Sequence, residues 1–99
     1  MDVMKLADIE RIVRGLLRQY GAEYAVLFGS YARGEAAADS DIDIIVFGGK
    51  RFDPKKIFEF AEDLRESTGK KVDAFEITEV DQNTPFFRNV LHDGLRIVA

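Results

Sequence analysis

The chain has 99 residues, no cysteine and a formal net charge of −4. This length suits one domain, and the lack of cysteine excludes a disulfide framework and a thiolate zinc site. The negative charge argues against nucleic acid as a direct electrostatic partner. With 46% hydrophobic residues, 32% charged residues and no apolar run long enough to cross a bilayer, the composition is typical of a globular cytoplasmic protein without a membrane partner.

Apolar residues at helical spacing predict a first helix over residues 5–20, which ends before Gly21. The short apolar run over 24–28 is typical of a buried strand, and Ser30 begins a helical turn that extends through Gly34. The remaining elements predicted in chain order are a strand over 41–47, a helix from Pro54 to Gly69, a strand over 71–77, a helix from Pro85 and a strand over 95–98.

This order of elements predicts one α/β (α+β) domain over residues 1–99, with a small mixed β-sheet and helices mainly on one face. The buried stripe of the helix that starts at Pro54 is expected to comprise Ile57, Phe58, Ala61 and Leu64. In the last helix, Phe86 and Phe87 are adjacent and cannot both face one core squarely, so one of them is available for association.

Two aspartates begin the second predicted strand. Side chains alternate between the two faces of a strand, so Asp41 and Asp43 point the same way and the intervening Ile42 points the other way. Because Ile42 and the next isoleucine require a core, the carboxylates are expected on an open face, where a hard cation such as Mg²⁺ would relieve their repulsion. The alternative is that Asp41 ends a turn and Asp43 lies on a solvated edge.

A glycine–serine turn follows the first predicted strand. Free backbone N–H groups at the start of a helical turn attract anions, and glycine lets a phosphate approach the backbone closely, so Gly29 and Ser30 form a candidate phosphate site. Arg33 lies one turn further on and can bind phosphate through its guanidinium fork. The alternative is an ordinary capped turn in which Arg33 pairs with Glu35 or Asp39.

Together, these residues stand as GSYARGEAAADSDIDIIV over positions 29–46. This pattern resembles the nucleotidyltransferase superfamily that includes DNA polymerase β, and most of all its minimal nucleotidyltransferases. The resemblance implies a polymerase β palm-like fold and a third carboxylate on a later strand, at Asp73. Ala74 departs from the leucine common in the family. Glu76 is the competing carboxylate on the opposite strand face, and pairing of Asp73 with Lys70 or Lys71 is the structural alternative.

The resemblance also implies a reaction, in which a nucleoside monophosphate moves from an NTP to a hydroxyl group with release of pyrophosphate. Asp41, Asp43 and Asp73 would hold two Mg²⁺ ions and carry the catalysis, while Gly29 and Ser30 position the phosphates. Arg33 would either clamp phosphate or brace the loop. ATP is the nucleotide that the family favours, and GTP, CTP and UTP stay open.

In the resembling small proteins the partner is a HEPN toxin, and the nucleotidyltransferase acts as its antitoxin by placing AMP on a toxin tyrosine. The resemblance therefore implies a homo- or hetero-oligomer and a protein adenylyltransferase. Two alternatives are a stoichiometric antitoxin that masks its partner without catalysis and a transferase that modifies a small molecule such as an antibiotic. Tyr31, within the phosphate turn, would line the path of the acceptor or expose part of its ring.

Overall fold

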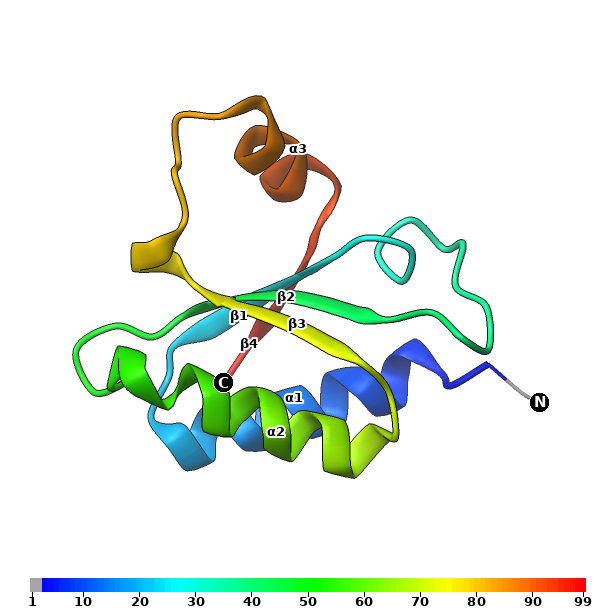
Figure 1. Ribbon diagram of the computed structural model, residues 1–99, viewed down its shortest axis with the longest axis horizontal. Coiled ribbons are helices and arrows are strands. Elements are labelled where there is room, and N and C mark those ends of the chain that lie inside the picture. The colour runs from blue at the N-terminus through cyan, green and yellow to red at the C-terminus, as the bar shows by residue number, and fades with distance from the viewer. Residues whose placement is uncertain (1–2) are drawn as a thin grey trace.

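The computed structural model describes residues 3–99, so the first two positions of the expected domain lie outside the described residues. It contains three α-helices, four strands and two short 3₁₀ turns within this range (Figure 1). In chain order these are α1 (Leu6–Tyr20), β1 (Tyr24–Phe28), β2 (Ile42–Phe47), η1 (Pro54–Lys56), α2 (Ile57–Thr68), β3 (Val72–Glu76), η2 (Ile77–Glu79), α3 (Pro85–Asp93) and β4 (Leu95–Val98). No helix within residues 3–99 is both long and apolar enough to span a bilayer.

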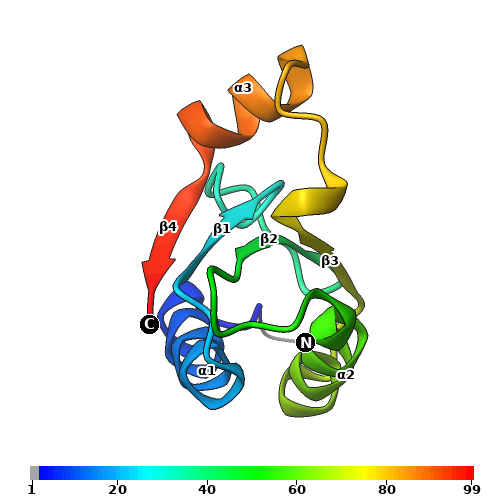
Figure 2. The same cartoon turned by 90° about the vertical axis from the view of Figure 1, so that its left-hand side faces the viewer.

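The four strands form one mixed sheet in the order β3-β2-β1-β4. The central strand β1 pairs antiparallel with both β2 and β4, whereas β3 lies parallel to β2 and is reached through α2. Helices α1 and α2 lie side by side on one face, and α3 lies on the other side of the sheet (Figures 1 and 2). The predicted α/β class, with a small mixed sheet and most helices on one face, is confirmed.

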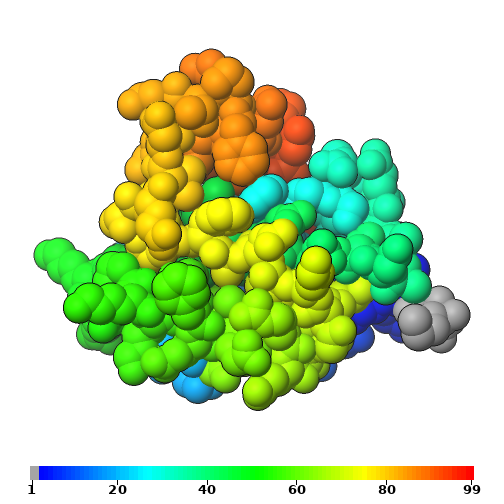
Figure 3. Space-filling model, viewed as in Figure 1, coloured from blue at the N-terminus to red at the C-terminus, as the bar shows by residue number. Residues whose placement is uncertain are grey.

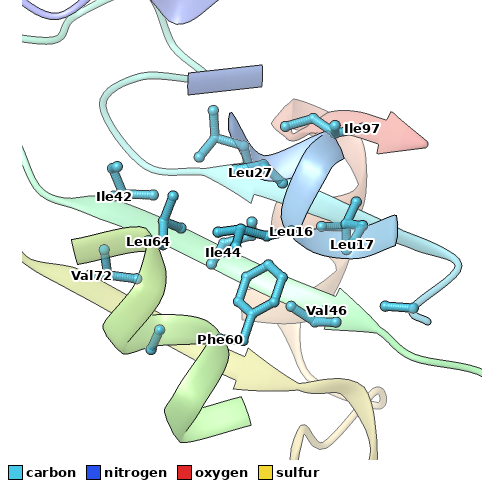
Figure 4. Packing of buried hydrophobic residues seen from close by; sticks show 14 of the residues in the cluster. Leu16, Leu17, Leu27, Ile42, Ile44, Val46, Phe60, Leu64, Val72 and Ile97 are labelled. Atoms are coloured by element: carbon cyan, nitrogen blue, oxygen red, sulfur yellow. The ribbon is translucent and has the colours of Figure 1, made fainter. Parts of the chain in front are cut away.

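The main core lies between the sheet and the pair α1 and α2, where strand side chains interdigitate with the buried stripes of both helices (Figure 4). The expected place of Phe58 in this core is wrong, because its side chain is 77% exposed and Phe60 is fully buried instead. Residues 57, 60, 61 and 64 share the inner face of α2 because they stand at i, i+3, i+4 and i+7, whereas residue 58, at i+1, lies on the flank of the helix.

A smaller cluster covers the opposite face of the sheet and holds α3 in place. Val26 and Ile45 of the sheet pack against Phe87 and Val90 of the helix. Thr84 begins α3, since its side chain accepts a hydrogen bond from the Phe87 N–H. The adjacent Phe86 is 51% exposed, in agreement with the expectation that only one of the two phenylalanines faces the core.

The predicted element boundaries differ at the two segments that matter most for function. Strand β2 begins at Ile42, so Asp41 immediately precedes it, and the segment over 30–34 is a hydrogen-bonded turn instead of a regular helix. In that turn the Arg33 N–H donates to the Gly29 carbonyl and the Glu35 N–H donates to the Ser30 carbonyl. These two hydrogen bonds close the turn directly after β1.

Candidate active site

A cleft of about 620 Å³ opens on the α3 side of the sheet. Its walls are the turn after β1, the N-terminal ends of β2 and β3, and one face of α3. In the space-filling view, the orange residues of α3 stand apart from the cyan residues of the turn (Figure 3). The six residues assigned from the sequence to phosphate and metal line this one cleft: Gly29, Ser30, Arg33, Asp41, Asp43 and Asp73.

The pairing of β2 with β3 brings two of the carboxylates together. Asp43 and Asp73 are register partners in the parallel ladder, and the residues before them, Ile42 and Val72, are buried in the main core. Strand alternation therefore directs both carboxylates to the cleft face. Burial raises the pKa of Asp43, and the neighbouring carboxylates of Asp73 and Asp41 raise it further.

Repulsion between like charges thus adds to burial in raising this pKa, and a divalent cation at the carboxylates would relieve that repulsion. The donor set fits Mg²⁺, which binds through a few carboxylate oxygens and takes further oxygens from substrate phosphates. Within residues 3–99, no group of three or more His, Cys, Asp or Glu side chains is placed to hold a metal ion by itself. Phosphate oxygens of a substrate would therefore have to complete the ligand shell.

Gly29 is required where the phosphate turn meets Asp43. Its φ is +76°, and a Cβ at this position would overlap Oδ2 of Asp43 and lie 3.3 Å from its Cγ. The turn and the carboxylate are thus in direct contact, which only glycine allows. Arg33 lines the same cleft, and its Nε lies 3.2 Å from Oε2 of Glu35 in an exposed ion pair. The pairing with Glu35 considered from the sequence is therefore present, alongside the position in the cleft.

The alternative considered for Asp73, an ion pair with Lys70 or Lys71, is absent. Within residues 3–99 neither lysine forms an ion pair with Asp73. Lys70 instead donates from Nζ to the carbonyl oxygens of Ala38 and Ser40, at 3.1 and 3.0 Å. These two bonds hold in place the loop that precedes Asp41 and β2.

Tyr31 and Glu76 lie outside the cleft. The expectation that Tyr31 lines the acceptor path or exposes part of its ring is wrong, because only 4% of it is exposed and it packs in the main core beneath Lys70. Glu76 is 2% exposed, and its carboxylate accepts hydrogen bonds from the N–H and the hydroxyl of Thr78 at the start of η2. Its role is local capping, so it does not compete with Asp73 for the cleft.

The face of α3 in the cleft was missed by the sequence reasoning. It consists of residues at i, i+3, i+4 and i+7, which are Phe86, Asn89, Val90 and Asp93. Phe28 and Phe75 add aromatic side chains from the sheet, and Phe28 contacts Phe86 edge to face with ring centres 5.6 Å apart. The helical spacing was visible in the sequence, but which side of the helix meets the sheet depends on tertiary packing.

Comparison with known proteins agrees with this geometry. The family model described as "Polymerase beta, Nucleotidyltransferase" matches residues 10–99. The protein adenylyltransferase MntA of Thermococcus cleftensis is 36% identical over 74% of this chain and 78% of its own length. A relative from Methanocaldococcus jannaschii, provisionally named a protein adenylyltransferase, is 34% identical over 91% of this chain and 94% of its own.

Solved structures show the same likeness. One that is provisionally named a minimal nucleotidyltransferase superposes with a TM-score of 0.74 at 29% identity, over 96% of this chain and 95% of that one. Another, described as a toxin-antitoxin with AMP-PNP, has a TM-score of 0.74 at 27% identity, over 89% of this chain and 71% of that one. Both contain the arrangement of sheet and helices described above.

Proposed function

Because this chain belongs to the polymerase β nucleotidyltransferase family and is a nucleotidyltransferase, we propose that it transfers AMP from ATP to a hydroxyl group of a partner protein. The observation that carries this proposal is that one cleft holds Asp41, Asp43 and Asp73 together with the glycine–serine turn. We also propose that residues 1–99 act as one minimal nucleotidyltransferase domain and that the reaction takes place in the cytoplasm, where ATP is available.

Each candidate residue has a role in this reaction. The backbone N–H groups of Gly29 and Ser30 bind the β and γ phosphates, and Arg33 assists once its guanidinium turns from Glu35 to the substrate. Asp41 and Asp43 would hold Mg²⁺ together with the triphosphate, and Asp73 would be the third carboxylate of the site. Two Mg²⁺ ions bound there would supply electrostatic stabilisation of the charge that develops on the attacking and leaving oxygens.

The hydroxyl oxygen of the acceptor attacks the α-phosphorus in line with the bond to pyrophosphate. A new P–O bond forms, the bond to the leaving pyrophosphate breaks, and Asp73 takes the proton of the acceptor hydroxyl. Asp73 suits this role because it is exposed at the mouth of the cleft on the edge strand β3, where a partner protein has access. Asp43 is further inside the sheet, next to the phosphate turn.

We propose a HEPN-type toxin as the partner and a tyrosine hydroxyl as the acceptor, so that the chain works as an antitoxin in a hetero-oligomer. This is supported by the relatives named protein adenylyltransferases and by the similar structure described as a toxin-antitoxin with AMP-PNP. The carboxylates of the cleft favour catalysis over simple masking of the toxin, since masking requires no cluster of like charges.

The decisive experiment is transfer of label from [α-³²P]ATP with Mg²⁺ to the purified partner toxin. We expect Asp41→Asn, Asp43→Asn and Asp73→Asn each to abolish labelling. Asp39→Asn is the matched control, because Asp39 is an exposed carboxylate two residues before Asp41 and does not line the cleft. If the unaltered protein transfers no label and all three variants still neutralise the toxin, the chain is a masking antitoxin and not an enzyme.

A further inference from the structure

We infer that the cleft face of α3 binds the base of the nucleotide, with the Phe86 ring stacked on adenine and the Asn89 amide hydrogen bonded to its edge. This inference rests on the proposed nucleotidyl transfer at the same cleft. It assigns the residues that select the nucleotide. The residues assigned above to phosphate and metal cannot fill that role. Three observations support it: the charge of the two cleft walls, the exposure of Phe86 and the free amide of Asn89.

The distribution of charge orients the substrate. The turn after β1 offers backbone N–H groups and the cation Arg33, which suit phosphates. The opposite wall, α3, has no Lys, Arg or His among the cleft residues and adds the carboxylate of Asp93, which contacts the exposed His92 ring at 2.7 Å and gives phosphates no donor in the cleft. The triphosphate therefore lies at the turn, and the α3 wall is left for the uncharged end of the nucleotide.

Phe86 presents an aromatic surface at this wall. It is 51% exposed although its neighbour Phe87 is buried, and its ring meets Phe28 edge to face at an interplanar angle of 84°. The contact with Phe28 occupies one side of the residue and orients the ring while its outer surface stays open. An oriented ring of this kind binds any of the bases by stacking, because every base has a π-face.

Asn89 supplies the selectivity that stacking lacks. It lies one helical turn after Phe86 on the same cleft face, it is exposed, and its side chain forms no hydrogen bond within residues 3–99. A side-chain amide has both a donor and an acceptor, which match N7 and the N6 amino group of adenine as a pair. Guanine has a carbonyl oxygen in place of the N6 amino group, so the pair of bonds to the amide is lost.

The test is calorimetric binding of AMP-PNP, GMP-PNP and tripolyphosphate in the presence of Mg²⁺. We expect AMP-PNP to bind the unaltered protein roughly tenfold more tightly than GMP-PNP, the discrimination typical of one bidentate amide contact. Asn89→Ala should bring the two affinities to within about twofold of each other, with GMP-PNP little changed. Phe86→Ala should weaken both nucleotides by roughly tenfold or more, as loss of a stacking ring does, and Phe86→Tyr should restore them.

Tripolyphosphate has no base, so its affinity should be the same in every variant. Leu91→Ala is the matched control, since Leu91 is 54% exposed on the same helix and does not line the cleft. Full affinity for AMP-PNP in both Phe86→Ala and Asn89→Ala would overturn the inference and leave the proposed function intact. If the unaltered protein binds neither AMP-PNP nor tripolyphosphate, the inference and the proposed function both fail.

Discussion

Replacing Gly29 with alanine tests whether contact between the phosphate turn and Asp43 controls activity. Gly29 has a φ of +76°, and Gly34, at the other end of the same turn, has a φ of +71°. An alanine at either position bears the cost of the left-handed conformation, about 1–2 kcal/mol. Only at position 29 does the new Cβ overlap Oδ2 of Asp43, because nothing lies within 4 Å of a Cβ at position 34.

The two variants should therefore match in stability and differ in activity. For a domain of this size each kcal/mol lowers the melting temperature by roughly 4–8 °C, so both should melt about 4–16 °C below the unaltered protein. In Gly29→Ala the Asp43 carboxylate must also move by roughly 1 Å, and a displacement of that size in a catalytic site costs about 100-fold in rate. Gly34→Ala should keep nearly full activity.

The assay is transfer of labelled AMP to the partner, measured well below both melting temperatures, together with thermal unfolding of each variant. Binding of tripolyphosphate by the two variants separates damage to the phosphate turn from displacement of the carboxylate. If Gly29→Ala and Gly34→Ala lose activity to the same degree, backbone strain explains the loss and the contact with Asp43 is irrelevant. Full activity in Gly29→Ala would also refute the reasoning.

Three further predictions concern one residue of the cleft, the lysine that holds the loop before it, and a tyrosine on the opposite side of the sheet. Burial and then the two neighbouring carboxylates raise the pKa of Asp43 above its value in the unfolded chain, so ionisation of Asp43 destabilises the fold as pH rises through the raised pKa. Asp43→Asn should therefore raise the melting temperature in EDTA at pH 7 and abolish the stabilisation by Mg²⁺ and ATP. A lower melting temperature of this variant would contradict the reasoning. Lys70→Met should lower transfer roughly tenfold in a kcat assay, since the loop before Asp41 loses both of its bonds to Nζ; unchanged kcat would show that the loop holds its shape alone. The hydrogen bond to Asp63 raises the pKa of Tyr20 to about 12, so its stabilising contribution is complete below pH 10 and disappears as pH rises through 12. Tyr20→Phe should cost about 1 kcal/mol in urea unfolding at pH 7, with a difference that closes above pH 10; a difference independent of pH would point to packing.

Strand periodicity explains why the carboxylates and their face were predictable from the sequence. Ile42 and Ile44 require the core, so the alternation alone fixes where Asp43 points, and the parallel register then places Asp73 beside it. Phe58 shows that apolar character alone does not define a buried stripe. Phe60 stands at i+3 from Ile57, on the face shared by Ala61 and Leu64, whereas Phe58 stands at i+1 and lies off that face.

Features that depend on distant parts of the chain were not predictable. Tyr31 is buried in the main core, and Lys70, from the segment after α2, lies over its ring and holds the nearby loop. The α3 wall of the cleft likewise depends on how Phe87 and Val90 seat the helix on the sheet. Neither contact has a local signal, because each joins segments that are far apart in sequence.

The two walls of the cleft are anchored unequally. Strands β2 and β3 are fixed by ladder hydrogen bonds and by the main core, whereas α3 is seated chiefly by the small cluster around Phe87 and Val90. Under the proposed binding of the base by α3, substitutions on this helix would alter the preferred nucleotide without disturbing the carboxylates of the other wall. Substrate choice and reaction chemistry would then be separately adjustable in this small scaffold.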